Sequence, residues 1–124
     1  MEDKTLFDSE KKLMDIIWDE APVESGKLVK LAEEKLGWNK STTYTVLRKI
    51  KNKGFVANED SIVSVLIPRE EVQIMESNQI VKERFGGSLP KFVAAFLGTK
   101  SLSDNEADEL MDLIKNHMGG EHND

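Results

Sequence analysis

The sequence predicts a mostly α-helical chain with one small β-hairpin, which lies between two groups of three helices. Apolar residues recur at helical spacing through three consecutive segments that end before residue 54. Two short runs rich in β-branched residues follow, with turn-forming residues between them. Beyond residue 68 the helical spacing returns. This change of period and its reversal predict the order helix, helix, helix, hairpin and then three more helices.

The first two helices are predicted from short amphipathic segments with recognisable ends. Apolar residues recur every three or four positions from about Ser9 to Glu20, and Asp8 or Ser9 can cap this helix. The second helix spans about Gly26 to Leu36. Gly37 follows it and suits the left-handed position that ends many helices. We therefore expect two short helices joined by the turn "APVES".

The third helix and the hairpin complete the N-terminal region. The helix begins at about Lys40, with Asn39 as its cap, and ends at Gly54. The runs "FVAN" and "IVSVLI", separated by "EDS", then read as two short antiparallel strands. Three helices followed by a hairpin is the order of a winged helix-turn-helix, so we predict a winged-helix DNA-binding domain over residues 1–67.

The remaining residues, 68–124, are predicted to form a helical dimerisation domain. Helices are expected from Arg69 to Phe85, from Ser88 to Leu97, and from the capping box "SDNE" at 103–106 to about His117. So short a region has little core of its own, and a second copy is the commonest cover for its apolar stripes. The residues expected to pair are Val81, Phe85, Leu89, Phe92, Val93, Phe96, Leu97, Leu110 and Ile114.

Composition excludes several classes of function. The 124 residues carry 17 basic and 23 acidic side chains, and most of the acidic excess follows residue 67. The absence of cysteine excludes disulfides, thiolate metal sites and cysteine nucleophiles. We expect a cytoplasmic protein without signal peptide or membrane insertion, which uses no cofactor and is not an enzyme. His117 and His122 lie near the C-terminal tail, where ligands are rarely preorganised, so no metal site is predicted.

The third helix carries the functional prediction. Between Trp38 and Ala57 the sequence has five basic residues, several hydroxyl side chains and no acid. The second helix of a helix-turn-helix enters the major groove, where small hydroxyls can contact bases and cations contact phosphates. A solvated cationic helix end is the alternative interpretation. The candidate DNA-binding residues are Lys40, Ser41, Thr42, Tyr44, Thr45, Arg48, Lys49, Lys51 and Lys53.

Three segments together resemble one known family. "LMDIIWDEAPVESGKL", "WNKSTTYTVLRKIKNKGFV" and "FGGSLPKFVAAFLGTKSLSDNEADELMDLI" are similar to the penicillinase repressors, over roughly residues 6 to 117. The resemblance implies a homodimeric winged-helix repressor of double-stranded inverted-repeat operators, with intertwined C-terminal helices. It places base reading on Ser41, Thr42 and Thr45, and a backbone or base-edge contact on Lys49. In β-lactam-sensing members a membrane-linked sensor metalloprotease pathway cleaves the repressor, and the matching bond here joins Ala95 to Phe96.

The chain departs from the family pattern at several positions. Many members have a basic residue at the position of Ser41, and an asparagine commonly stands at the position of Ala95. The wing carries "NEDS", which is acidic and should repel phosphate. The copper-responsive relatives use a cysteine-rich tail, which this sequence lacks. A winged-helix protein-interaction module without specific DNA binding is therefore retained as the alternative function, because winged helices also dock proteins.

Overall fold

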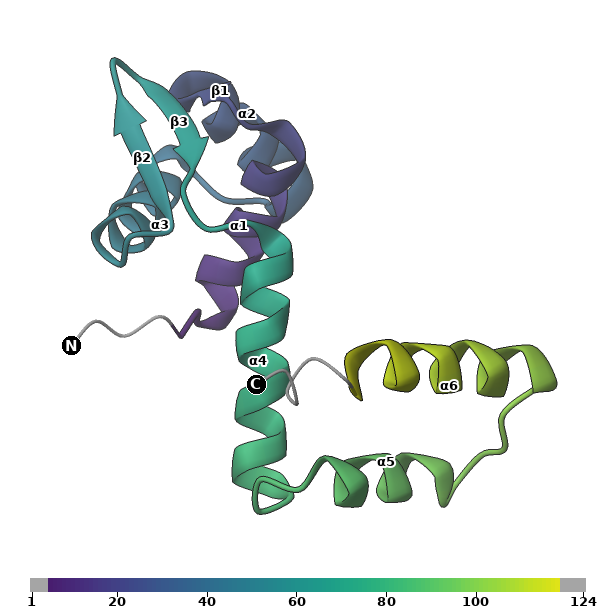
Figure 1. Cartoon of the computed structure of the whole chain (residues 1–124). Coiled ribbons are helices and arrows are strands. Elements are labelled where there is room, and N and C mark those ends of the chain that lie inside the picture. Colours follow the sequence, from purple (N-terminus) through teal and green to yellow (C-terminus); the bar gives the residue numbers. More distant parts are fainter. Residues whose placement is uncertain (1–4, 119–124) are drawn as a thin grey trace. The chain divides into compact units, whose positions relative to one another are not determined.

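The computed structural model describes residues 5–118 and confirms a mostly helical fold with a small antiparallel sheet (Figure 1). The elements follow the predicted order, with one additional short strand after the first helix. Their bounds are α1 Asp8–Glu20, β1 Val23–Glu24, α2 Ser25–Leu36, α3 Lys40–Asn52, β2 Val56–Glu59, β3 Ile62–Val65, α4 Arg69–Arg84, α5 Leu89–Leu97 and α6 Asp104–Met118.

Local capping explains three of the helix ends. The Asn39 side chain accepts a hydrogen bond of 2.8 Å from the backbone N–H of Thr42, which confirms it as the cap of α3. Gly37 has a φ of 73° after α2, as predicted. The capping box before α6 is also confirmed, because Ser103 and Glu106 bond each other's backbone N–H groups at 3.1 and 3.3 Å.

The start of α1 differs from the prediction. The cap is Phe7 rather than Asp8 or Ser9, and the helix begins one residue earlier than expected. The backbone N–H of Phe7 donates to the Glu10 carboxylate at 2.8 Å. The Glu10 carboxylate in the first turn thus satisfies the N–H of the cap residue itself, and the Phe7 side chain makes no cap bond.

The sheet has three strands in the order β1-β3-β2, all antiparallel (Figure 1). Glu59 pairs with Ile62, so β2 and β3 are joined by a two-residue turn at Asp60 and Ser61. Both turn residues have positive φ, 53° and 64°, as the twist of a tight hairpin requires. Strand β1 was not predicted, because two residues are too short to show a period and pair only through a distant partner.

The core of the N-terminal half joins α1, α2, α3, the sheet and the first turns of α4. Its fully covered side chains include Leu13, Leu28, Ile50 and Phe55. Val72 of α4 belongs to the same cluster at 2% exposure. The chain divides into two compact units, the first running to Met75 and the second beginning at Glu76. The first unit therefore includes about two turns of α4.

The second unit contains the end of α4 together with α5 and α6. The rings of Phe85 and Phe92 meet edge to face at 5.3 Å, and Phe92 stacks near Phe96 at 6.5 Å. No residue of α5 or α6 is buried, and Leu89, Phe96 and Ile114 are each more than half exposed. Much of the apolar side of each helix is thus exposed in a single chain. No helix within residues 5–118 has the length and apolar content needed to cross a membrane.

Candidate nucleic-acid interface

Helix α3 has one buried face and one polar face. Thr43, Val46, Leu47 and Ile50 are buried against the core. The opposite face exposes hydroxyl groups in its first turns and cations further along, and no residue of the helix is acidic. The exposed residues of this face, which we call the α3 face, are Lys40, Ser41, Thr45, Arg48, Lys49, Lys51 and Asn52.

The first turn of α3 is held by Asn39. Besides capping Thr42, its Oδ1 accepts a hydrogen bond of 3.2 Å from the Ser41 hydroxyl. The Thr43 hydroxyl donates to the Asn39 carbonyl at 3.3 Å and is fully buried. Thr42 is half-buried, whereas Ser41 and Thr45 are exposed. Of the threonines in this turn, Thr45 therefore presents the most accessible side chain.

Tyr44 links α3 to the start of α2 and to the wing. Its O–H donates to the Ser25 hydroxyl oxygen at 3.4 Å. The Ser25 backbone N–H in turn donates to the carbonyl of Ser61, in the turn of the hairpin, at 2.8 Å. Tyr44 is half-buried and packs on the core, so its ring stabilises the fold while part of it stays accessible at the surface. Trp38 likewise packs against the core.

A shallow hollow of about 260 Å³ lies between α3 and β2. It is lined by Tyr44, Leu47, Arg48, Lys51 and Asn58. Arg48 and Lys51 are exposed, so two cations lie at a hollow of mixed polar and apolar lining beside the α3 face. An anionic group such as a backbone phosphate suits this combination of charge and hydrogen-bond donors.

Lys53 differs from the other predicted cations. Its Nζ lies 2.7 Å from the Glu10 carboxylate and 2.8 Å from the Thr5 carbonyl, and 4.3 Å from the centre of the Phe7 ring. Glu10 is only 1% exposed. A buried carboxylate requires a paired cation, so Lys53 supports the junction of α3 with the N-terminal segment. The sequence could not indicate this partner, which lies 43 residues away.

The wing presents acidic side chains beside this basic helix. Glu59 and Asp60 are exposed at the hairpin turn, and Glu24 is exposed opposite Ile62 on the neighbouring strand. Their negative charge disfavours close approach to phosphate. The electrostatic features favourable to DNA are therefore concentrated on the α3 face.

Models of known protein families identify the family to which the chain belongs. The model of the family described as penicillinase repressor matches residues 6–116, which is most of the chain. The chain belongs to the penicillinase repressor family. Proteins of this family are DNA-binding transcriptional repressors. The resemblance inferred from three sequence segments is thus confirmed over almost their whole span.

Individual relatives within the penicillinase repressor family are distant. The penicillinase repressor of Bacillus licheniformis is 25% identical over 116 residues, covering 90% of this chain and 91% of its own length. The methicillin resistance regulatory proteins MecI of Mammaliicoccus sciuri and Staphylococcus aureus are each 21% identical over 120 residues. In both cases 92% of this chain and 98% of the relative are covered. The likeness therefore extends across both compact units.

The residues predicted to contact DNA divide into two groups in this penicillinase repressor family member. Most lie on the α3 face or, as Thr42 and Tyr44 do, half-buried beside it. Among them, Lys53 instead forms an ion pair with the buried carboxylate of Glu10 on α1. Within residues 5–118 no group of three or more acidic, histidine or cysteine side chains is arranged to hold a metal ion. The Nδ1 atom of His117 lies 2.7 Å from the Leu113 carbonyl, and His122 lies outside the described residues.

Proposed function

We propose that the chain is a homodimeric repressor that acts in the cytoplasm and binds a double-stranded inverted-repeat operator through α3 of each copy. Residues 1–67 supply the winged helix that binds DNA, and residues 68–124 supply the dimerisation region. The observation that carries this proposal is the α3 face, which combines exposed hydroxyls and cations without a single acidic residue. Family membership supports the same function.

The order of side chains along α3 indicates a different role in DNA binding for each part of the helix. Ser41, Thr42 and Thr45 lie in its first turns, where a recognition helix meets base edges. Small hydroxyls there can donate to or accept from bases and contact thymine methyl groups. Arg48, Lys49 and Lys51 follow and meet phosphates, which provides affinity that falls with rising salt.

Exposed apolar side chains on α5 and α6 support the proposed dimerisation. Phe96 and Leu97 are 57% and 40% exposed, and Ile114 is 54% exposed. A second copy covers identical surfaces with two-fold symmetry. Pairing also strengthens DNA binding, because docking of the second half-site becomes intramolecular.

Release of the operator is proposed to occur by cleavage between Ala95 and Phe96. Both residues are exposed and lie in the last turn of α5. Cutting this bond severs α6 from the DNA-binding unit, so the copies lose part of their pairing surface. A membrane-linked sensor metalloprotease pathway is the expected agent, as the family resemblance implies.

The proposal is tested by selecting a binding site from random duplex DNA and titrating the full-length protein against it over a range of salt. An inverted repeat whose binding weakens steeply with salt is the expected result. Failure to select any sequence, with no salt-sensitive binding at micromolar protein, would favour the protein-interaction module instead. Sedimentation of the wild-type chain and of Phe96→Asp then tests the pairing surface, since a monomeric wild-type protein contradicts it.

A further inference from the structure

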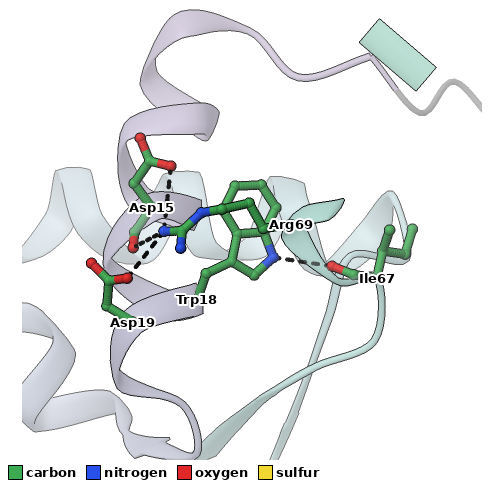
Figure 2. Close-up of polar contacts among 5 residues, drawn as sticks. All are labelled: Asp15, Trp18, Asp19, Ile67 and Arg69. Atoms are coloured by element: carbon green, nitrogen blue, oxygen red, sulfur yellow. Dashed lines mark hydrogen bonds and ion pairs between the residues drawn. The ribbon is translucent and has the colours of Figure 1, made fainter. Parts of the chain in front are cut away.

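The beginning of α4 is fastened to α1 by a group of polar contacts around Arg69 (Figure 2). The Arg69 guanidinium donates to the Asp15 carbonyl at 3.2 Å and to the Asp19 carboxylate at 3.1 Å. Its Cζ atom also lies over the Trp18 ring, 5.1 Å from the ring centre. The indole N–H of Trp18 donates to the Ile67 carbonyl at 3.0 Å, just before α4 begins. We call these four contacts the Arg69 clasp.

The Arg69 clasp adds to a small apolar contact between α4 and the core of the first unit. Val72 is the single buried residue of α4, and Met75 packs partly against the same core. A helix held at one buried position can pivot about it. The clasp acts one turn earlier, on the adjoining loop and the first residue of the helix, and thereby opposes such pivoting.

Stability alone is a poor explanation for this arrangement. The side chains of Asp15 and Asp19 are 57% and 61% exposed, and that of Arg69 is 37% exposed. Ion pairs at such exposure contribute little to folding. Their geometry is nevertheless specific, because one guanidinium bonds a backbone carbonyl and a carboxylate while stacking on an indole. We therefore expect these contacts to fix the direction of α4 more than they raise the free energy of unfolding.

Direction matters because α4 continues from the first unit into the second. Its 16 residues make a rod ~24 Å long. Tilting this rod by about 10° at its start displaces its far end by ~4 Å, comparable with the ~3.4 Å rise of one base pair.

We propose that Arg69 is a positioning residue that sets the spacing between the two half-sites that the dimer accepts. It acts by fixing the direction of α4 on the DNA-binding unit. This inference rests on the proposed function, because it requires paired copies on an inverted repeat. The clasp contacts no DNA in this mechanism, so its loss should relax spacing without weakening the binding of each unit to its own half-site.

The first measurement uses the selected operator, versions with one or two base pairs added to or removed from its centre, and a single half-site. Wild-type protein should discriminate strongly among the spacings. Arg69→Ala should reduce that discrimination several-fold while the affinity for the single half-site stays near the wild-type value. Asp19→Asn should act in the same direction more weakly. Arg84→Ala, a matched loss of arginine at the exposed end of α4, should retain the wild-type preference.

A second measurement does not depend on DNA. The chain lacks cysteine, so spin labels can be placed only at Lys30→Cys on α2 and Asn78→Cys on α4. Labelled chains are diluted with unlabelled chains so that one distance is read per dimer. Arg69→Ala should broaden this distance distribution, whereas Arg84→Ala should not.

The two measurements separate failure of this inference from failure of the proposed function. An Arg69→Ala protein with unchanged spacing preference and unchanged label distances would overturn the role of the clasp. An equal loss on the single half-site and on the spaced operators would also overturn it, because the residue would then serve folding or DNA contact. Should the wild-type protein bind no inverted repeat, the proposed function fails together with the spacing role, and the label distances decide whether Arg69 directs α4.

Discussion

Lys51 and Lys53 look equivalent in the sequence, and substituting each by methionine should produce opposite results. Lys51 is exposed at the edge of the hollow beside the α3 face. Lys53 is paired with Glu10, whose side chain is 1% exposed. Methionine removes the charge from both positions and keeps a long side chain, so the two variants are matched controls for each other.

Lys51→Met should change DNA binding and leave stability unchanged. In the proposed dimer two phosphate contacts are lost, which lowers the log–log salt slope by roughly 1.8. The loss of affinity between about 50 and 200 mM salt should then be roughly tenfold smaller than for the wild-type protein. Because the Lys51 side chain is exposed, the free energy of unfolding of Lys51→Met should stay within ~0.5 kcal/mol of the wild-type value.

Lys53→Met should do the reverse, because it leaves the Glu10 carboxylate buried without its cation. Breaking such a pair typically costs about 3–5 kcal/mol. The Lys53 side chain is 19% exposed, and Glu10 keeps the hydrogen bond from Phe7, so we expect a loss near the lower end, about 3 kcal/mol. The salt slope should stay at the wild-type value. Adding Glu10→Gln to Lys53→Met should restore much of the lost stability.

Urea denaturation and fluorescence anisotropy on a labelled operator at several salt concentrations provide both readouts. The reasoning is refuted if Lys53→Met leaves the free energy of unfolding unchanged and reduces the salt slope as Lys51→Met does. That outcome would return Lys53 to the group of phosphate contacts. A double variant no more stable than Lys53→Met would show that the buried charge is not the cause of the loss.

Three further variants test other parts of the N-terminal unit. Asn39→Ala removes the cap bond to Thr42 and should lower stability by about 1 kcal/mol in thermal denaturation. Thr45→Ala should weaken specific binding by about 1 kcal/mol and relax base preference, measured on operators with single base substitutions. An equal loss on every sequence would argue against base reading by Thr45. Glu59→Gln combined with Asp60→Asn should strengthen binding to all sequences, most clearly at low salt, and a weaker complex would mean that the wing carboxylates assist binding.

The features that the sequence predicted well depend on neighbouring residues. The Asn39 cap, the left-handed Gly37 and the Ser103–Glu106 capping box each involve groups within five positions of one another. Apolar spacing over ten or more residues likewise predicted the helices. The composition of α3, which contains hydroxyls and cations but no acid, was sufficient to indicate a polar helix face.

The features that the sequence did not predict depend on distant partners. Strand β1 exists because Val23 and Glu24 meet β3, about 40 residues later. The Lys53–Glu10 pair spans 43 positions, and the bond from Arg69 to Asp19 spans 50. No local period or short motif encodes such pairs. Consequently the sequence identified which cations lie on or near α3, but only the tertiary structure separates those on the exposed face from the one committed to a buried carboxylate.

The hydrogen bonds through Ser25 have a consequence for the thermodynamics of complex formation. One serine joins the turn of the hairpin to α2 through its backbone, and receives the Tyr44 hydroxyl of α3 on its side chain. The wing and α3 are therefore assembled before a ligand arrives, so docking should resemble the meeting of rigid bodies. We expect the heat-capacity change of binding to match the apolar surface covered at the contact alone, without the larger negative value that accompanies coupled folding.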